Sequence, residues 1–217
     1  MSPAFNLCGV ILAAGESTRM GRDKALLPWP PAAHGVAPST GETLLSAAIT
    51  ALKPFTDAVI VVAGKNAEKL APVVSAHGAS LVKNPAPERG QFSSMQTGLS
   101  EVLAGGYNAA MITLVDCPPL STGSLKQLRL TFDEALQNGK WGVAPENDGK
   151  HGHPLLAGHE LIVAFLSAPA TSNAREVKHT FAEFIVHVPV PDSLVSVDVN
   201  TPEQYAALSA PPQSDPD

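Results

Sequence analysis

The sequence predicts an α/β protein in three layers, with a mostly parallel central sheet and helices on both of its faces. Short apolar runs of strand length alternate with longer stretches of helical pattern, an order typical of parallel sheets. The chain has 217 residues, enough to bury a single large core. Its composition, 44% hydrophobic and 16% charged, is typical of a folded α/β protein and unlike a disordered one.

Each element is assigned from its own pattern. The run 58–63 (AVIVVA) is apolar throughout, as expected of a strand covered on both faces. Thr201 followed by Pro202 is typical of a helix N-cap and first helical residue, so a last helix is expected to begin at Pro202. The predicted strands are 7–14, 58–63, 79–83, 109–115, about 141–145, about 184–188 and 195–199, with a further apolar stretch at 154–157. The other predicted helices are 44–52, 67–77, about 93–103, 124–138 and 159–167.

Two segments do not fit this alternation. The stretch 28–41 contains four prolines and two glycines, and we interpret it as a surface loop. The last residues, 209–217 (SAPPQSDPD), are expected to be a disordered tail. We therefore expect one domain over residues 1–208.

Charge and cysteine content exclude several kinds of function. A net charge of −6 and a pI near 5.6 do not favour binding to nucleic acid or to an anionic membrane. The apolar run 7–14 is too short to span a bilayer and no basic segment precedes it. Cys8 and Cys117 do not make a disulfide framework, so a reducing, cytoplasmic location is expected.

The strongest motif follows the first predicted strand directly. At the carboxyl end of a parallel strand, small residues let a nucleotide approach the backbone, and turn N–H groups can face phosphate oxygens. Arg19 and Lys24 add two positive charges suited to a triphosphate. The alternative is a glycine-containing turn with solvated basic residues. The spacing matches neither a Walker A loop nor G-x-G-x-x-G, which disfavours NTP hydrolysis and hydride transfer. The small and apolar residues concerned are Leu12, Ala13, Ala14 and Gly15.

Polar residues follow other predicted strands. Asp116 ends the apolar run 111–115, where a carboxylate can hold Mg²⁺ while substrate phosphates complete the coordination shell; the alternative is a helix or loop cap. Ser93 and Ser94 open a predicted helix, where free N–H groups and hydroxyls suit a ribose or phosphate, or simply cap the helix. Gly64 and Asn84 follow neighbouring strands and are weaker candidates for the same crevice.

Three further residue types carry less specific signals. His151 and His153 are two apart, but no further His or Cys stands at ligand spacing, so a zinc site is not expected. Cys117 has no partnered base in the sequence and is interpreted as a packed thiol. Trp29 and Trp141 are interpreted as packing residues.

The pattern L-A-A-G-x-S-x-R-M-G-x-x-K at 12–24 resembles the signature loop of the MobA-like NTP transferases. Within that family it is most similar to the molybdenum cofactor cytidylyltransferases, whose loop reads LAAG, whereas the guanylyltransferases usually have LAGG. Five further blocks follow in the family's order across most of the chain. They are 84–85 (NP), 90–94 (GQFSS), 116–118 (DCP), 152–154 (GHP) and 197–203 (VDVNTPE).

The resemblance implies a Rossmann-like nucleotidyltransferase fold and Mg²⁺-dependent transfer of a nucleoside monophosphate from an NTP to a phosphorylated acceptor, with release of pyrophosphate. It implies that Arg19, Lys24 and Asp116 are catalytic, and that Asp116 and Asp198 hold the metal. Asp198 could equally be a cap. His153 would line the acceptor pocket. The family often has D-x-D-T-P at 198–202, so Asn200 is a departure that removes one carboxylate.

Two other functions remain open at this stage. A sugar-1-phosphate nucleotidyltransferase would use the same fold and loop. A non-catalytic nucleotide-binding regulatory protein would not need Arg19, Lys24, Asp116 and Asp198 together. The sequence does not fix the base of the NTP, the acceptor, the oligomeric state or the role of the loop at 28–41.

Overall fold

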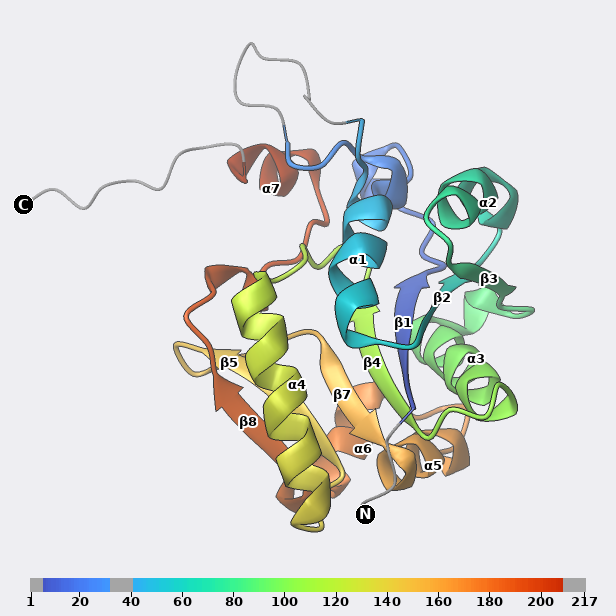
Figure 1. The fold of residues 1–217 in the computed structure, drawn as a ribbon. Coiled ribbons are helices and arrows are strands. Elements are labelled where there is room, and N and C mark those ends of the chain that lie inside the picture. The colour runs from blue at the N-terminus through green and yellow to red at the C-terminus, as the bar shows by residue number, and fades with distance from the viewer. Residues whose placement is uncertain (1–5, 32–40, 209–217) are drawn as a thin grey trace, which may run out of the picture.

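The computed structural model describes residues 6–31 and 41–208. The predicted tail at 209–217 and most of the predicted loop at 28–41 lie outside these residues. Within them, the strands form one sheet of eight, in the order β3-β2-β1-β4-β7-β5-β6, with β8 beside β5 (Figure 1). The strands are β1 (Leu7–Ala13), β2 (Ala58–Ala63), β3 (Ser80–Lys83), β4 (Ala109–Leu114), β5 (Gly142–Asn147), β6 (Lys150–His151), β7 (Leu155–Gly158) and β8 (Ile185–Pro189).

The sheet is mixed, and its largest part is parallel. β1 pairs in parallel with β2 and β4, and β2 with β3. β7 is antiparallel to both β4 and β5, whereas β8 is parallel to β5. The α-helices are α1 (Leu44–Leu52), α2 (Ala67–Ala76), α3 (Gln91–Ala104), α4 (Thr122–Gln137), α5 (His159–Ser167), α6 (Ala174–Thr180) and α7 (Pro202–Ala207).

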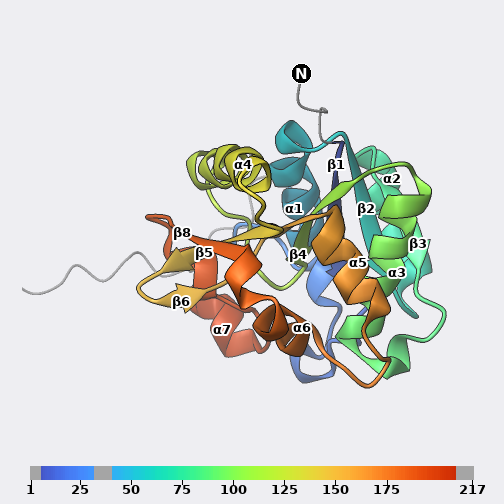
Figure 2. The ribbon, with the colours of Figure 1, turned by 90° about the horizontal axis from the view of Figure 1, so that it is seen from below.

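Helices cover both faces of the sheet, as Figure 2 shows in a view from below. Successive side chains of a strand point to opposite faces. Accordingly, Ile11 of β1 lies in a core with α1, α2 and α4, and its neighbour Val10 lies in a second core with α3, α5 and α6. All seven residues of β1 are buried, as expected of a central parallel strand. The predicted three-layer fold is confirmed.

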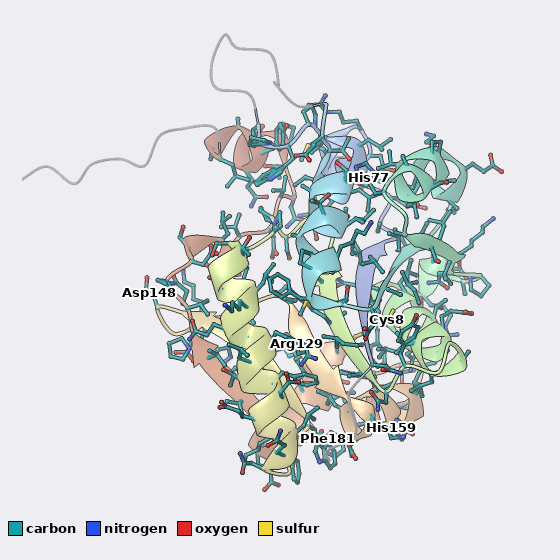
Figure 3. All side chains as sticks on the ribbon, in the orientation of Figure 1. Cys8, His77, Arg129, Asp148, His159 and Phe181 are labelled. Carbon is teal, nitrogen blue, oxygen red and sulfur yellow. The ribbon has the colours of Figure 1, made fainter. Side chains whose placement is uncertain are left out.

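Aromatic packing closes the amino-terminal end of β5. The Trp141 ring stacks on Phe184 with centroids 4.2 Å apart and lies 5.1 Å from Phe181, which Figure 3 labels. Trp29 packs against a small core that includes Met20 and Val199. Both tryptophans are therefore packing residues, as predicted.

The predicted strand at 195–199 is wrong. Residues Ser193–Ser196 form a 3₁₀ helix whose N-cap is Asp192, which accepts a hydrogen bond from Leu194 N. The segment continues without pairing to the sheet, and Val199 N donates to Asp116 O at 2.8 Å. Val195 is buried in the core that contains α1, α2 and α4, whereas Val199 is buried in the small core beside Trp29. The segment is therefore apolar in sequence without being a strand.

One strand and one α-helix were not predicted. β6 is a two-residue strand that returns beside β5. α6 begins after Asn173, whose side chain accepts from Glu176 N while the Glu176 side chain accepts from Asn173 N. This capping box, an N-x-x-E pattern, is the signal in the sequence that could have revealed the helix.

The topology places a crevice at one edge of the sheet. The chain leaves β1 toward β2 on one side and later returns to place β4 on the other side. The carboxyl ends of the adjacent parallel strands β1 and β4 therefore meet at this edge, and the carboxyl ends of the strands are where open α/β sheets bind ligands. In Figure 1 this edge faces the top of the view, near the beginning of α1 and α7. In the described part of the chain, no helix is both long and apolar enough to cross a bilayer.

Candidate active site

The loop after β1 is folded tightly enough to return Lys24 to the sheet edge. Ser17 (φ 52°) and Gly21 (φ 70°) both adopt left-handed backbone conformations, which reverse the chain on either side of a short 3₁₀ helix at Thr18–Met20. The Ser17 hydroxyl then accepts a hydrogen bond from Lys24 N at 3.1 Å. The left-handed serine is an uncommon conformation for a residue with a side chain, and the hydrogen bond helps to hold it.

The loop after β2 supports the loop after β1. Asn66 Nδ2 donates to Ala13 O at 3.0 Å and to Asp23 Oδ2 at 2.8 Å. Gly64 allows the two loops to approach, because a Cβ at this position would lie 2.8 Å from Ala14 O. Gly64 is buried and does not line the cavity described below, so its role is to allow the loop after β1 to pack against the loop after β2.

Three predicted residues and Asn200 form one polar cluster. Lys24 Nζ lies 2.6 Å from Asp116 Oδ2 and 3.1 Å from Asn200 Oδ1. Arg19 Nη2 donates to the same Asn200 oxygen at 3.3 Å. The Lys24 and Asp116 side chains are only 13% and 20% exposed, so this pair is screened less than a surface salt bridge. The cluster joins the loop after β1, the end of β4 and the segment before α7.

The second predicted carboxylate, Asp198, lies on a neighbouring surface. It is exposed, and its Oδ1 accepts a hydrogen bond from Cys117 Sγ at 3.1 Å. Cys117 is buried, and burial, followed by the charge of Asp198, raises the pKa of its thiol. Both cysteines are free and buried, and Cys117 is a packed thiol as predicted.

The start of α3 is held by a buried amide. Asn84 is 2% exposed, and its Nδ2 donates to the hydroxyls of Ser93 and Ser94, at 2.9 Å each. Ser93 in turn donates to Gly90 O at 2.8 Å. The N-cap position is occupied by Gly90 without a side-chain hydrogen bond, so neither serine is the cap. Asn84 and Ser93 lie beneath the surface that Ser94 helps to line.

These elements surround a cavity of about 600 Å³, which we call the nucleotide cavity. Its wall includes the predicted residues of the loop after β1 and the cations and carboxylate of the polar cluster. A cavity of this size fits a ligand as large as a nucleotide. Of the predicted residues, those that line it are Leu12, Ala13, Ala14, Gly15, Arg19, Lys24, Ser94 and Asp116. Lys65, Glu88 and Gln91 also line it and were not predicted.

His153 does not line the nucleotide cavity. It lines a cavity of about 470 Å³ between α3, β4 and α6, and a shallower one of about 370 Å³ that also includes Asp198. Burial, and then the charge of Lys178, lower the pKa of His153, which favours the neutral imidazole. The structure thus places the predicted acceptor residue beside, but apart from, the polar cluster.

Two carboxylates of this region, Asp116 and Asp198, have the donor chemistry that Mg²⁺ prefers. Among residues 6–31 and 41–208, no three His, Cys, Asp or Glu side chains converge as a ready-made metal cage. Mg²⁺ is typically held by one or two carboxylates, with water and substrate phosphates completing its octahedron. Asp116 and Asp198 supply hard oxygen donors of this kind, and both lie close enough to Cys117 to add to the effect of burial in raising the pKa of its thiol. The Asn200 amide oxygen already accepts hydrogen bonds from Lys24 and Arg19.

The fold and this site define a class of protein. A glycine-containing loop at the carboxyl edge of a parallel sheet, two cations aimed at its cavity and a carboxylate at the next strand are typical of α/β proteins that bind a nucleotide through its phosphates.

Comparison with known proteins identifies the family. The sequence profile of the MobA-like NTP transferase domain matches residues 9–184, so the chain belongs to this family and is a nucleotidyltransferase. A probable molybdenum cofactor guanylyltransferase of Mycobacterium avium (strain 104) is 33% identical over 96% of this chain and 98% of its own length. The molybdenum cofactor cytidylyltransferase of Escherichia coli (strain K12) is 22% identical over 90% of this chain and 92% of its own.

A solved structure supports the fold independently. The crystal structure of Rv0371c from Mycobacterium tuberculosis H37Rv superposes with a TM-score of 0.75 at 22% identity, covering 94% of this chain and 97% of that one.

Proposed function

We propose that this protein transfers CMP from CTP to the phosphate of molybdopterin, in either its metal-free or its molybdenum-bound form, and releases pyrophosphate. The observation that carries the proposal is the polar cluster: a half-buried Lys24–Asp116 pair, with Arg19 alongside, at the point where the nucleotide cavity meets the end of β4. The molybdenum cofactor enters because relatives that cover nearly the whole chain carry it in their names.

The reaction is an in-line displacement at the α-phosphorus. An oxygen of the acceptor phosphate forms a new bond to that phosphorus, and the bond to the bridging oxygen of pyrophosphate breaks, so that pyrophosphate leaves with the electron pair. The acceptor phosphate is already anionic at neutral pH and needs no general base. Lys24 and Arg19 neutralise the charge that grows on the α-phosphate and the leaving group. Their shared hydrogen bonds to Asn200 keep the two cations side by side.

Asp116 and Asp198 are the residues that would hold Mg²⁺. Bound there with the triphosphate, Mg²⁺ supplies positive charge to the phosphate oxygens and fixes their orientation. Asp116 accepts a hydrogen bond from the Lys24 ammonium in this structure, so the same carboxylate would position the lysine and hold the metal. Asp116→Asn should therefore raise the Mg²⁺ concentration needed for half-maximal activity, whereas an unchanged metal titration would remove Asp116 from the site.

The choice of CTP rests on one methyl group. Ala14 occupies the position where guanylyltransferases usually have glycine, and it lines the nucleotide cavity with its Cβ close to Gly64. In this proposal, the methyl takes up space beside the bound nucleotide that a glycine would leave free, which would favour a smaller pyrimidine base. The relatives include both cytidylyl- and guanylyltransferases, so the base is the finer part of the proposal.

The test is pyrophosphate release from purified enzyme with molybdopterin, Mg²⁺ and each NTP in turn. Release with CTP and molybdopterin together, and not with either alone, supports the proposal. Pyrophosphate release with GTP and molybdopterin would support molybdopterin as the acceptor but would replace CTP by GTP as the nucleotide substrate. Pyrophosphate release only in the presence of a sugar-1-phosphate would favour that sister activity. Nucleotide binding without pyrophosphate release in the presence of any of these acceptors would favour a regulatory protein. We further propose that the enzyme acts in the cytoplasm, where its free thiols would remain reduced.

A further inference from the structure

The 470 Å³ cavity, which we call the α6 cavity, joins an apolar floor to a basic rim. Leu12, Met95 and Leu155 are among the side chains of the floor, and they come from three different elements. Arg175 and Lys178 of α6, three residues apart, form the rim together with Arg89. A pocket that is mostly apolar with a few convergent polar groups is the usual form of a small-molecule site.

The rim cations have no carboxylate partners. Among residues 6–31 and 41–208, none of the three forms an ion pair. Lys178 is half-buried, and burial, followed by the charge of Arg175, lowers its pKa. Two like charges one helical turn apart repel each other, and partial burial of one adds a desolvation cost. An anion bound between them would relieve both effects.

The position of the rim separates it from the triphosphate. Neither Arg175 nor Lys178 lines the nucleotide cavity, where Arg19 and Lys24 are. Lys178 does line the shallow cavity of about 370 Å³ together with His153 and Asp198. The α6 cavity therefore adjoins the nucleotide cavity, with which it shares Leu12, Gly90 and Gln91, and its rim borders the cavity of Asp198. An acceptor in the α6 cavity would thus lie next to the bound nucleotide.

We propose that Arg175 and Lys178 are specificity-determining residues that bind an anionic group of the acceptor and take no part in binding the NTP. This inference rests on the proposed function for the identity of the acceptor, but not for the presence of the anion site. The ligand it describes has an apolar, flat part that covers Leu12 and Leu155, and an oxyanion that meets the two cations of α6.

The anion site can be tested without any turnover. Sulfate, as a phosphate mimic, is titrated into the protein while the backbone amide NMR signals of Ala174–Thr180 are followed. The wild type should show a saturable shift, and Arg175→Gln/Lys178→Gln should lose it. Lys126→Gln, which removes an exposed cation of α4, should leave it intact. Equal sulfate shifts in the wild type and the double variant would overturn the inference, as would the absence of a saturable shift in the wild type.

The assignment to the acceptor is tested by binding and kinetics. Arg175→Gln/Lys178→Gln should raise the KM for molybdopterin about tenfold or more, the usual scale for losing a charge-assisted contact. Its affinity for Mg-CTP should be unchanged. A parallel loss of CTP affinity, or an unchanged KM, would contradict the assignment. If the wild type shows the sulfate site but does not use molybdopterin, the proposed acceptor fails while the anion site stands.

The unliganded melting temperature separates this role from a structural one. Because the two cations repel each other, the double variant should melt at the same temperature as the wild type or higher. A large drop would mean that Arg175 and Lys178 hold α6 in place, and it would overturn the proposal.

Discussion

The nucleotide cavity and the α6 cavity lie at the same edge of the sheet, but their cations are neutralised differently. In the first, Lys24 pairs with Asp116 at 2.6 Å, and Lys65 pairs with Glu16 at 2.6 Å on the exposed rim. In the second, the described residues offer no carboxylate to Arg175 or Lys178. A phosphate that binds Lys24 must therefore displace an internal ion pair, whereas an anion in the α6 cavity would bind Arg175 and Lys178 without displacing one.

The difference gives a physical reason why the proposed Mg²⁺ dependence should be confined to the nucleotide cavity. When a phosphate takes Lys24 from Asp116, it leaves a partly buried carboxylate without its counter-ion, which costs free energy. A divalent cation held by Asp116 would offset that cost and would supply positive charge to the phosphate. The α6 cavity requires no such exchange, so its anion should bind with or without Mg²⁺.

The largest expected effect comes from Lys24. Lys24→Ala should lower turnover about 10²–10³-fold, because it removes a cation placed where charge develops in the transition state. The protein should still fold, since this side chain belongs to the polar cluster and not to either core. Steady-state kinetics and a melting curve, with Lys126→Ala as the matched control, provide the check. Near-normal turnover would mean that the nucleotide cavity is not the reaction centre.

Gly64→Ala tests whether the two cavities are independent, because its effect should be confined to the nucleotide cavity. The new Cβ would lie 2.8 Å from Ala14 O, forcing the loops after β1 and β2 apart. We expect a stability loss of about 1–3 kcal/mol and weaker CTP binding, with sulfate binding at α6 unchanged. The control is Gly123→Ala, where the nearest atom to the new Cβ is 3.9 Å away. If sulfate binding fell equally, the two cavities would be one cooperative site.

Ala14→Gly tests the base preference. Loss of one methyl from the nucleotide cavity should shift the ratio of kcat/KM for GTP over CTP upward, by about tenfold or less, the scale of a single small apolar group. The activity with CTP should change little. A ratio that stays constant would show that other residues of the cavity select the base.

The smallest expected effect is a pH dependence from the acceptor side. Burial and Lys178 lower the pKa of His153 below its usual 6.5, so the folded protein binds fewer protons than the unfolded chain in the window below that value. The contribution of His153 to the free energy of unfolding should be fully present above pH 6.5 and should be lost as the pH drops through this window. His153→Gln should flatten that part of the profile, measured by chemical denaturation at several pH values. If stability depended on pH with the same slope in the variant, His153 would not be the source of the pH dependence. His187, whose pKa is also lowered by burial, would then be the candidate.

Much of the fold followed from local patterns. The bounds of α1, β2 and α5 agree with the predicted ranges, because each is an apolar run with a distinct period or cap. The segment 195–199 was mistaken for a strand because two valines four residues apart, Val195 and Val199, are buried by separate contacts. Pattern alone does not show whether a strand partner exists.

The candidate site was predicted unevenly for a similar reason. The residues of the loop after β1 and Asp116 stand at strand ends, and the rule that strand ends meet at one edge brings them together. Asn200, 176 positions from Lys24, reaches it only through the return of the chain before α7. Arg175 and Lys178 were missed because their helix is short and their shared cavity depends on how α6 packs against α5.

The most direct test of the central claim is thermal stabilisation by CTP, GTP, UTP, ATP and dTTP, each with and without Mg²⁺. A ligand that binds only the folded state raises the melting temperature according to its concentration relative to Kd. The account predicts a shift with CTP that requires Mg²⁺. No shift with any NTP, or a shift of the same size without Mg²⁺, would contradict it.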